Sequence, residues 1–497
     1  MKSIRNDTEV LARGAGIALF GKIIGRGLQL AVQVVLARLL GPMQFGLYVL
    51  GATVFQVGQQ IGLMGLDNGV IHFGGLALHQ DDKKDEFFAV IRAAQFLSLG
   101  SALIVGLVVF ILSPWFALNI IHQVELIDVL RGFALTLIFA TGLRVNSAVT
   151  RITRKMHFSV LSEDIFPYLV SLGLIYLFFQ SLKLSLSFAV IAVIAGFGAG
   201  WLLSQFFVVR LFKSQPVAVP MKLAKELVLF SLPTFVAVMF VFSLYGATIF
   251  LIGYFLSPQD VGIYQSASQI STLPVIILVA FNAIFTPMIH KLNQESQKPR
   301  LNELFKISTK WGLYVSLPLL MTVMIMPGQL LDVLYGQAYL NGTWPLVILI
   351  LAQTINTSTG AVGFLLVMNG HQNRWLFLTG ISFIIGLGLN IWLIPMWGIV
   401  GAAIANGCSV AFLYLSALLH VRSSLGMWPY DSRYWKGLFS AAISAGVIVL
   451  VVRLFPIQPL PQLALALGGA MTAFLLSLWV LRLDQEDWQA LRLLLNR

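Results

Sequence analysis

Apolar residues occur along this chain in long stretches, each about as long as a helix that crosses a bilayer. Such a helix needs roughly 20 predominantly apolar residues, and these stretches follow one another almost end to end, separated by short polar or Pro/Gly-marked breaks. The pattern predicts fourteen spans, at residues 14–39, 46–66, 88–113, 126–148, 159–179, 185–210, 227–255, 263–287, 306–326, 344–368, 375–394, 398–420, 437–454 and 461–482. Little of the chain is left for a soluble domain.

The composition supports an all-α integral membrane protein. Of the 497 residues, 58% are hydrophobic and only 10% are charged, which is unlike a soluble protein. Lys22 and Arg26 interrupt the first apolar stretch and no small-residue cleavage site follows, so we expect the first helix to be retained rather than removed as a signal peptide. The single cysteine, Cys408, excludes an internal disulfide and a cysteine-only metal site, and we expect it to be buried as a small apolar residue.

Positive charge indicates the orientation of the chain. Cytoplasmic loops near helix ends carry an excess of Lys and Arg, and with a cytoplasmic N-terminus 26 of the 32 Lys and Arg residues fall on that side. The C-terminus is then cytoplasmic as well. The net charge of +12 is explained by this topology and by attraction to anionic membrane lipids, so it gives no argument for a nucleic acid partner.

A short motif occurs twice at a constant spacing. "LGPMQFGLY" at residues 40–48 and "LSPQDVGIY" at residues 256–264 share Leu, Pro, Gly and Tyr at an offset of 216 residues, and each copy follows the first helix of a six-helix block. The repeat predicts two related lobes with a cleft between them. The expected boundaries are 1–210 for the N-terminal lobe, 211–225 for a cytoplasmic linker, 226–420 for the C-terminal lobe, and 421–497 for helices 13 and 14 with an amphipathic tail.

Five segments together resemble a known family. They are "LARLLGPMQFGLYVL", "FSLPTFVAVMF", "FLSPQDVGIYQSASQI", "VLYGQAY" and "NIWLIPMWGIVGAAIAN", which occur in this order over most of the chain. They resemble the polysaccharide transporter family, including the Wzx-type O-antigen flippases of the multidrug/oligosaccharidyl-lipid/polysaccharide (MOP) exporter superfamily. The resemblance implies two six-helix bundles in a V around a central cavity, and no cofactor.

The resemblance also implies a function in the bacterial cytoplasmic membrane. A member would move a polyprenyl-diphosphate oligosaccharide to the outer leaflet by alternating access, for the synthesis of O-antigen, capsule or exopolysaccharide. Its partners would include a polysaccharide polymerase and a chain-length regulator. At an offset of 216 residues the second lobe lacks counterparts of Lys22 and Arg26, which predicts a substrate site with its cations on the N-terminal side.

Lys22 and Arg26 are the main candidates for a binding site. On an ideal helix they share a stripe about 60° wide with Gln29 and Gln33. A charge at the bilayer centre costs about 2.5–3.5 kcal/mol on insertion scales unless it faces water, protein or an anion. One interpretation is that Arg26 and Lys22 bind the diphosphate of a lipid carrier in the central cavity. The other is that they snorkel and pair with a carboxylate or with backbone carbonyls.

Uncharged polar side chains form further stripes on three predicted spans. They suit the hydroxyl groups of a sugar in the cavity, although hydrogen bonds between helices would explain them as well. These residues are Gln56, Gln60, Gln265, Gln269, Gln353 and Asn356.

The energy source is constrained by what the sequence lacks. There is no GxxxxGK[ST] phosphate loop, so ATP is not expected to drive the protein directly. Ion coupling would require an acidic group buried within a span. The candidate carboxylates all fall near predicted helix ends, which favours downhill exchange; they are Asp67, Asp128, Glu163, Asp164 and Asp332.

Other functions remain open. A lipid II flippase would share the fold and a cationic cavity, whereas a drug exporter would use an apolar or acidic cavity. A membrane polysaccharide polymerase or ligase is the alternative of another class. Such enzymes usually carry a long outward loop with catalytic Arg or His, and the predicted outer loops are short and nearly free of these residues. A scaffolding protein would not explain cations near the midplane, and no catalytic or metal-binding constellation is expected.

Overall fold

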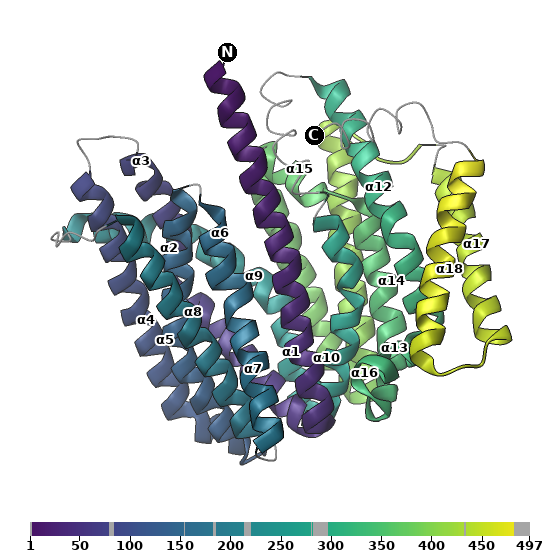
Figure 1. Ribbon diagram of the computed structural model, residues 1–497, viewed down its shortest axis with the longest axis horizontal. Coiled ribbons are helices and arrows are strands. Elements are labelled where there is room, and N and C mark those ends of the chain that lie inside the picture. The colour runs from purple at the N-terminus through teal and green to yellow at the C-terminus, as the bar shows by residue number, and fades with distance from the viewer. Residues whose placement is uncertain are drawn as a thin grey trace. The chain divides into compact units, whose positions relative to one another are not determined.

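The computed structural model of the chain is helical throughout its regular structure. It describes residues 2–78, 84–153, 155–181, 185–212, 220–279, 281, 297–431 and 434–481, and these contain no strand (Figure 1). The predicted amphipathic tail, "DQEDWQALRLLLNR" at residues 484–497, lies outside the described residues. The prediction of an all-α fold built from apolar spans is confirmed.

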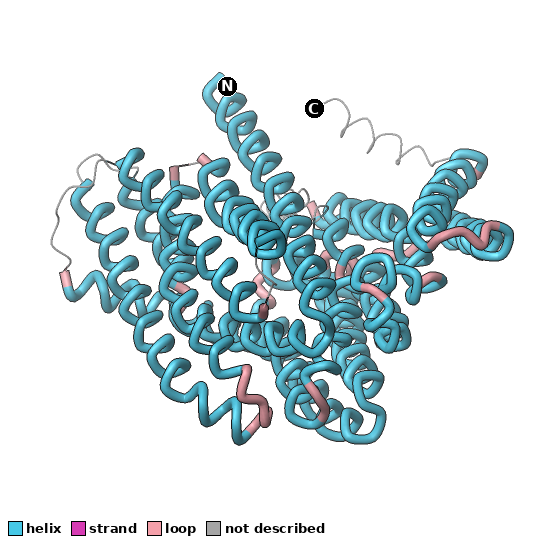
Figure 2. Tube along the Cα trace, turned by 60° about the horizontal axis from the view of Figure 1, so that its bottom comes forward, coloured by secondary structure: helices cyan, strands magenta, loops and turns pink. Residues whose placement is uncertain are grey.

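Ten helical stretches of the described residues are long and apolar enough to cross a membrane, or eleven if α12 (Lys298–Ile325) and α13 (Pro327–Tyr335), bent by 88°, form one span. Two of the ten each contain two predicted spans. Helix α1 (Lys2–Leu63) changes direction at Gly41 (φ 75°) and α16 (Gln372–Leu425) changes direction at Gly398 (φ 59°). In Figure 2 the described trace consists of helices joined by loops. Positive φ is accessible to glycine without steric cost, so both positions can join two spans without a loop. The total of fourteen spans stays a prediction.

The chain forms two compact units, Met1–Gly262 and Ile263–Arg497. In the first unit, α5 packs against α4, α8 and α1, while α9 packs against α1, α2 and α4. The helices of this unit that follow α1 are α2 (Leu66–Gly69), α3 (Gly75–Leu78), α4 (Lys84–Asn119), α5 (Leu126–Ile152), α6 (Met156–Ser159), α7 (Phe166–Ser181), α8 (Leu186–Phe212) and α9 (Met221–Phe255). The lobe boundaries predicted from the repeat stay a prediction.

Among its described residues, the first unit contains two π-helical segments: η1 (Val70–Gly74) and η3 (Val160–Ile165). Helices α6, η3 and α7 form one continuous apolar stretch from Met156 to Gln180. A π-turn is wider than an α-turn, is rare, and frequently occurs at functional sites. In this unit η3 packs directly against α1 and α5.

In the second unit, α14 and α15 pack against α16, and α12 packs against α14 and α17. Its described helices are the greater part of α10 (Pro258–Ser271), then α12 (Lys298–Ile325), α13 (Pro327–Tyr335), the 3-10 helix η4 (Gln337–Gly342), α14 (Thr343–Thr359), α15 (Val362–Met368), α16, α17 (Tyr434–Leu454) and α18 (Pro459–Val480). Helices α17 and α18 pair with each other and contact α12. The backbone N–H of Gly437 donates to the hydroxyl of Tyr314 at 3.1 Å, which fixes α17 against α12.

Large apolar side chains are exposed along the outsides of the helices, as expected of a multi-pass membrane protein. Phe96 is 74% exposed, and Trp344 and Trp479, at the ends of α14 and α18, are 69% and 73% exposed. In water such surfaces would be unfavourable, whereas lipid covers them, and tryptophan is enriched where helices meet the membrane interface. Cys408 is exposed on α16, so the expectation that it is buried was wrong. In an apolar surrounding its small, weakly polar thiol has no need of burial.

Candidate functional site

Helix α1 contacts η3 through two glycines one helical turn apart. A Cβ atom on Gly21 would overlap the side chain of Val160. One on Gly25 would lie 2.6 Å from the carbonyl oxygen and 2.7 Å from the Cβ of Asp164. Glycines spaced in this way let two helices approach closely within a membrane. The contact therefore brings the residues beside these glycines, Lys22 and Arg26, next to η3.

Lys22 and Arg26 are both exposed on the first unit. Lys22 interacts electrostatically with the carboxylate of Asp164. Arg26 donates from Nη1 to Oε1 of Gln29 at 3.3 Å and lies within electrostatic range of the hydroxyl of Tyr168. Lys22 thus has a carboxylate nearby, and both side chains are accessible. Their binding of a diphosphate stays a prediction.

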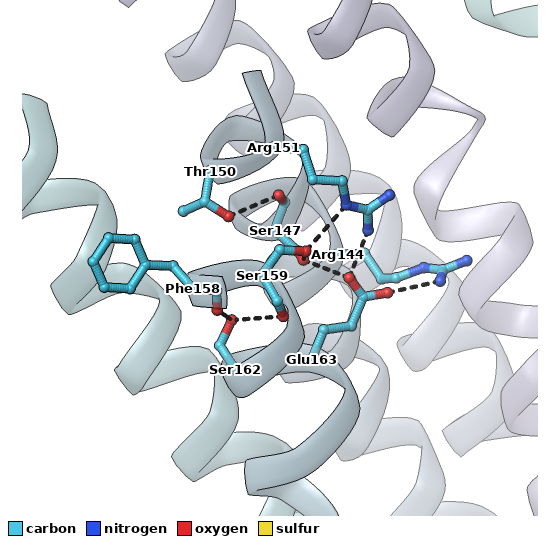
Figure 3. A network of polar contacts seen from close by, with 8 residues as sticks. All are labelled: Arg144, Ser147, Thr150, Arg151, Phe158, Ser159, Ser162 and Glu163. Atoms are coloured by element: carbon cyan, nitrogen blue, oxygen red, sulfur yellow. Dashed lines mark hydrogen bonds and ion pairs between the residues drawn. The ribbon is translucent and has the colours of Figure 1, made fainter. Parts of the chain in front are cut away.

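Glu163 on η3 is the centre of an ionic network next to this contact (Figure 3). Its Oε1 accepts from Nη1 of Arg144 at 2.9 Å, and its Oε2 accepts from Nη2 of Arg151 at 2.6 Å and also from the hydroxyl of Ser147. Nε of Arg151 donates to the hydroxyl of Ser159 at 3.1 Å, which lies 2.6 Å from that of Ser147. The carboxylate is thus held by three donors while its side chain is only 13% exposed.

The spacing of the donors on α5 makes this network possible. Arg144, Ser147 and Arg151 are three and four residues apart, so they lie on one face of the helix. Arg144 is about a third exposed, and its Nε is a buried donor without a hydrogen-bond partner. An unpaired buried N–H is unfavourable, so this donor is a cost of holding Arg144 in the network in this conformation.

The other predicted polar residues of the first unit differ in exposure. Gln29 and Gln33 are half-buried, and Oε1 of Gln33 is buried without a hydrogen-bond partner. Gln56 is exposed, whereas Gln60 is buried at 8% exposure. Lys22, Arg26 and Gln56 therefore present their side chains outside the packed core of the unit, and Gln60 does not.

The predicted polar residues of the second unit are largely used within it. Gln269 accepts from the hydroxyl of Tyr335 at 2.7 Å, and Gln265 is half-buried. Gln353 and Asn356 are each 4% exposed, and Nδ2 of Asn356 donates to Oε1 of Gln353 at 3.0 Å. In this conformation Gln353 and Asn356 are buried and hydrogen-bonded to each other. Their contact with a sugar stays a prediction.

Sequence analysis missed the ionic network, because it placed Glu163 and Asp164 near a helix end and used the arginines outside the first helix only to orient the chain. Both carboxylates lie within the span Met156–Gln180, and both arginines of the network belong to the span of α5, Leu126–Ile152. The signal that would have indicated the network is the acidic pair in "VLSEDIFPYLV", where two adjacent carboxylates are surrounded by apolar residues. Carboxylates in that setting require cationic partners.

Comparison with known proteins gives a family match over residues 35–343, to polysaccharide biosynthesis proteins. The match includes Arg144, Glu163 and Asp164 and begins after Lys22 and Arg26. It confirms the resemblance noted in the sequence.

Curated relatives are similar over part of the chain. The "Probable flippase AglR" of Haloferax volcanii is 30% identical over 234 residues, covering 45% of this chain and 47% of the relative. The "Probable low-salt glycan biosynthesis flippase Agl15" of the same organism is 22% identical over 45% of this chain and 48% of the relative. The "Succinoglycan biosynthesis transport protein ExoT" of Rhizobium meliloti is 24% identical over 69% and 65%. The chain spans about half the length of the two Haloferax relatives that it matches.

Solved structures share the fold. A "Lipid II flippase MurJ, inward closed conformation" has a TM-score of 0.75 at 13% identity, over 93% of this chain and 98% of that one. An inward-facing multidrug resistance MATE family transporter of the MOP superfamily has a TM-score of 0.63 at 16% identity, over 83% and 99%. At these identities the similarity concerns the fold alone.

Proposed function

From the premise that the chain belongs to the family of polysaccharide biosynthesis proteins, we propose that it is a flippase for a polyprenyl-diphosphate oligosaccharide. It moves this lipid from the cytoplasmic to the outer leaflet by alternating access. Three relatives support the proposal, since two are named as flippases and the third as a succinoglycan biosynthesis transport protein. The product feeds the synthesis of a surface polysaccharide such as O-antigen, capsule or exopolysaccharide.

The observation that carries the proposal is the exposed pair Lys22 and Arg26 within an apolar span. A lipid-linked oligosaccharide has three parts: an apolar tail, a diphosphate with two negative charges, and a sugar. The bilayer can accommodate the apolar tail, and side-chain amides can bind the sugar. The diphosphate can leave water only if cations neutralise its charge. Arg26 supplies a planar fork of donors and Lys22 a compact charge, both of which bind phosphate well.

The other parts of the proposal follow from the same substrate. Gln29, Gln33 and Gln56 on α1 provide amides for the hydroxyl groups of the first sugars. The protein resides in the bacterial cytoplasmic membrane with both termini in the cytoplasm, where its basic loops contact anionic lipids. A polymerase and a chain-length regulator act on the product.

The test is translocation of a polyprenyl-diphosphate oligosaccharide in proteoliposomes. The native protein is compared with the double variant Lys22→Gln, Arg26→Gln at equal insertion. The matched control is Arg210→Gln, Lys222→Gln, which removes two exposed cations elsewhere in the first unit. We expect transport by the native protein and the control, and loss of transport in the double variant.

Two results would count against the proposal in different ways. Equal transport by the native protein and the double variant would refute the assignment of Lys22 and Arg26 as the diphosphate site. The proposal that the protein is a flippase would stand. No transport by the native protein of any polyprenyl-diphosphate oligosaccharide would refute the flippase itself.

A lipid II flippase is the second candidate, favoured by the TM-score of 0.75 with MurJ over nearly the whole chain. Lipid II carries the same diphosphate, so the cations do not separate the two candidates. The same vesicles loaded with lipid II separate them, because we expect faster transport of the oligosaccharide carrier.

We place the chain among transporters rather than among membrane polymerases or ligases. The support is that the relatives are named for flipping or transport and that the solved neighbours are transporters. Incubation of the purified protein with lipid-linked oligosaccharide should therefore leave the length of the glycan unchanged.

A further inference from the structure

Asp164 and Glu163 are neighbours on η3, but their surroundings differ. Glu163 accepts hydrogen bonds from Arg144, Arg151 and Ser147, so its carboxylate is fully engaged. Asp164 accepts no hydrogen bond from the described residues. It is half-buried against Gly25 of α1 and lies within electrostatic range of Lys22, Arg151 and Arg144.

The position of Asp164 is fixed by backbone packing rather than by its own polar contacts. Gly25 approaches the carbonyl oxygen and Cβ of Asp164 so closely that a methyl group would not fit between them. Lys22 and Arg26 flank Gly25 on α1. The carboxylate of Asp164 is therefore held beside the proposed diphosphate cations without being tied to any of them by a hydrogen bond.

An empty flippase and a loaded one have opposite electrostatic needs. Without substrate, cations within an apolar span are unfavourable unless an anion is near. With substrate, the diphosphate supplies that anion, and a permanent counter-ion would compete with it. A transporter must also release its cargo, and cations without a competing anion would hold a diphosphate too tightly for turnover. A nearby carboxylate that is not locked in place meets both needs.

We propose that Asp164 is a resident counter-ion that exchanges with the substrate diphosphate for Lys22. In the empty protein the carboxylate of Asp164 neutralises Lys22. When substrate binds, the diphosphate replaces Asp164 as the counter-ion of Lys22. When the substrate is released, Asp164 neutralises Lys22 again. Glu163 is a positioning residue, because it holds Arg144 and Arg151 within electrostatic range of Asp164. This inference rests on the proposed function and adds to its site a residue that controls release of the substrate.

The experiment measures binding and turnover separately. The native protein and Asp164→Asn are reconstituted in nanodiscs of neutral phosphatidylcholine. Binding of farnesyl-diphosphate-linked N-acetylglucosamine, a short diphosphate diester, is measured by calorimetry. The matched control is Asp128→Asn, which changes an exposed carboxylate in the first turn of α5, far along that helix from Arg144.

We expect Asp164→Asn to bind the probe about tenfold tighter, a usual magnitude for coupling between two interacting groups. Its transport in proteoliposomes should be slower than that of the native protein, because release is impeded. Asp128→Asn should match the native protein in both assays. Asp164→Glu, which restores the charge, should return binding and transport toward native values.

A double variant tests whether the effect passes through Lys22. In Lys22→Gln, Asp164→Asn the gain in affinity should disappear, because the carboxylate no longer has a cation to compete for. A gain that persists without Lys22 would overturn the exchange. Unchanged or weaker binding by Asp164→Asn would also overturn it, and the flippase proposal would stand if Lys22→Gln, Arg26→Gln still weakened binding. Failure of the native protein to bind the probe would overturn both.

Discussion

Gly46 and Gly262 pack against each other through backbone atoms and leave no space for a side chain. A Cβ atom on Gly46 would overlap the carbonyl oxygen of Pro258 and lie 3.1 Å from the N of Gly262. One on Gly262 would overlap the carbonyl oxygen of Pro42 and lie 3.1 Å from the N of Gly46. The two glycines occupy equivalent positions in the two copies of the repeated motif. The copies therefore meet through the same atoms in both directions, as in a self-complementary twofold contact.

The reciprocal contact predicts that either glycine is sensitive to a single methyl group. Gly46→Ala and Gly262→Ala should each lower the unfolding temperature in detergent, because the clash is with backbone that cannot rotate away. Overpacking of this kind typically costs about 1–3 kcal/mol. Gly100→Ala on α4, where nothing lies within 4 Å, is the control and should unfold no earlier than the native protein. Unfolding temperatures of all three variants that match the native value would disprove the contact.

Gly25 and Gly27 provide a second test on a single helix. Gly25→Ala should separate α1 from η3 and abolish transport, since its Cβ would lie 2.6 Å from the carbonyl oxygen of Asp164. Gly27 has open space around it, and Gly27→Ala should retain transport and gain helix stability of up to about 1 kcal/mol. Transport by both variants in proteoliposomes is the measurement, and full activity of Gly25→Ala would contradict the packing.

Glu163→Gln should be strongly destabilising, because it leaves Arg144 and Arg151 without their shared carboxylate. Loss of one partner from a buried ion pair typically costs about 3–5 kcal/mol. Glu226→Gln, at an exposed position of α9, is the matched control and should be close to neutral.

The same network makes a prediction about its arginines. Replacing Arg144 and Arg151 with Gln together with Glu163→Gln should restore part of the lost stability, since no uncompensated charge then remains. The unfolding temperature of the triple variant is compared with that of Glu163→Gln. A triple variant less stable than Glu163→Gln would show that side-chain packing, not charge compensation, dominates the contribution of this network to stability.

A substitution at Gln33 should affect stability and transport differently. Its Oε1 is buried without a partner, and an unsatisfied buried polar atom costs about 1–3 kcal/mol. Gln33→Met should therefore keep or raise the unfolding temperature, while transport falls if the amide contacts a sugar. Native transport by a stable Gln33→Met would show that the amide is dispensable for the substrate.

Much of the fold could be predicted from the chain because it depends on local patterns. The length of each apolar stretch fixes the helices to within a few residues, as in α17 and α18. Where one helix was expected, the described residues include breaks at a π-turn, as in η3, and at a glycine, as at Gly360 between α14 and α15. At Gly41 and Gly398 the reverse occurred, since positive φ replaced the expected loop. A positive φ at a glycine leaves the hydrophobic pattern of the chain unchanged, so the pattern could not predict these two kinks.

The sequence by itself determined that this is a membrane protein, that its motif repeats, and that Lys22 and Arg26 share one face of the first helix. It did not determine their neighbours. Only the tertiary structure brought Asp164 to Lys22 and Glu163 to Arg144, because each pair joins residues on separate helices whose approach depends on glycine packing and on a π-turn. Helical periodicity fixes the direction in which a side chain points, whereas the identity of its partner depends on which helix packs opposite.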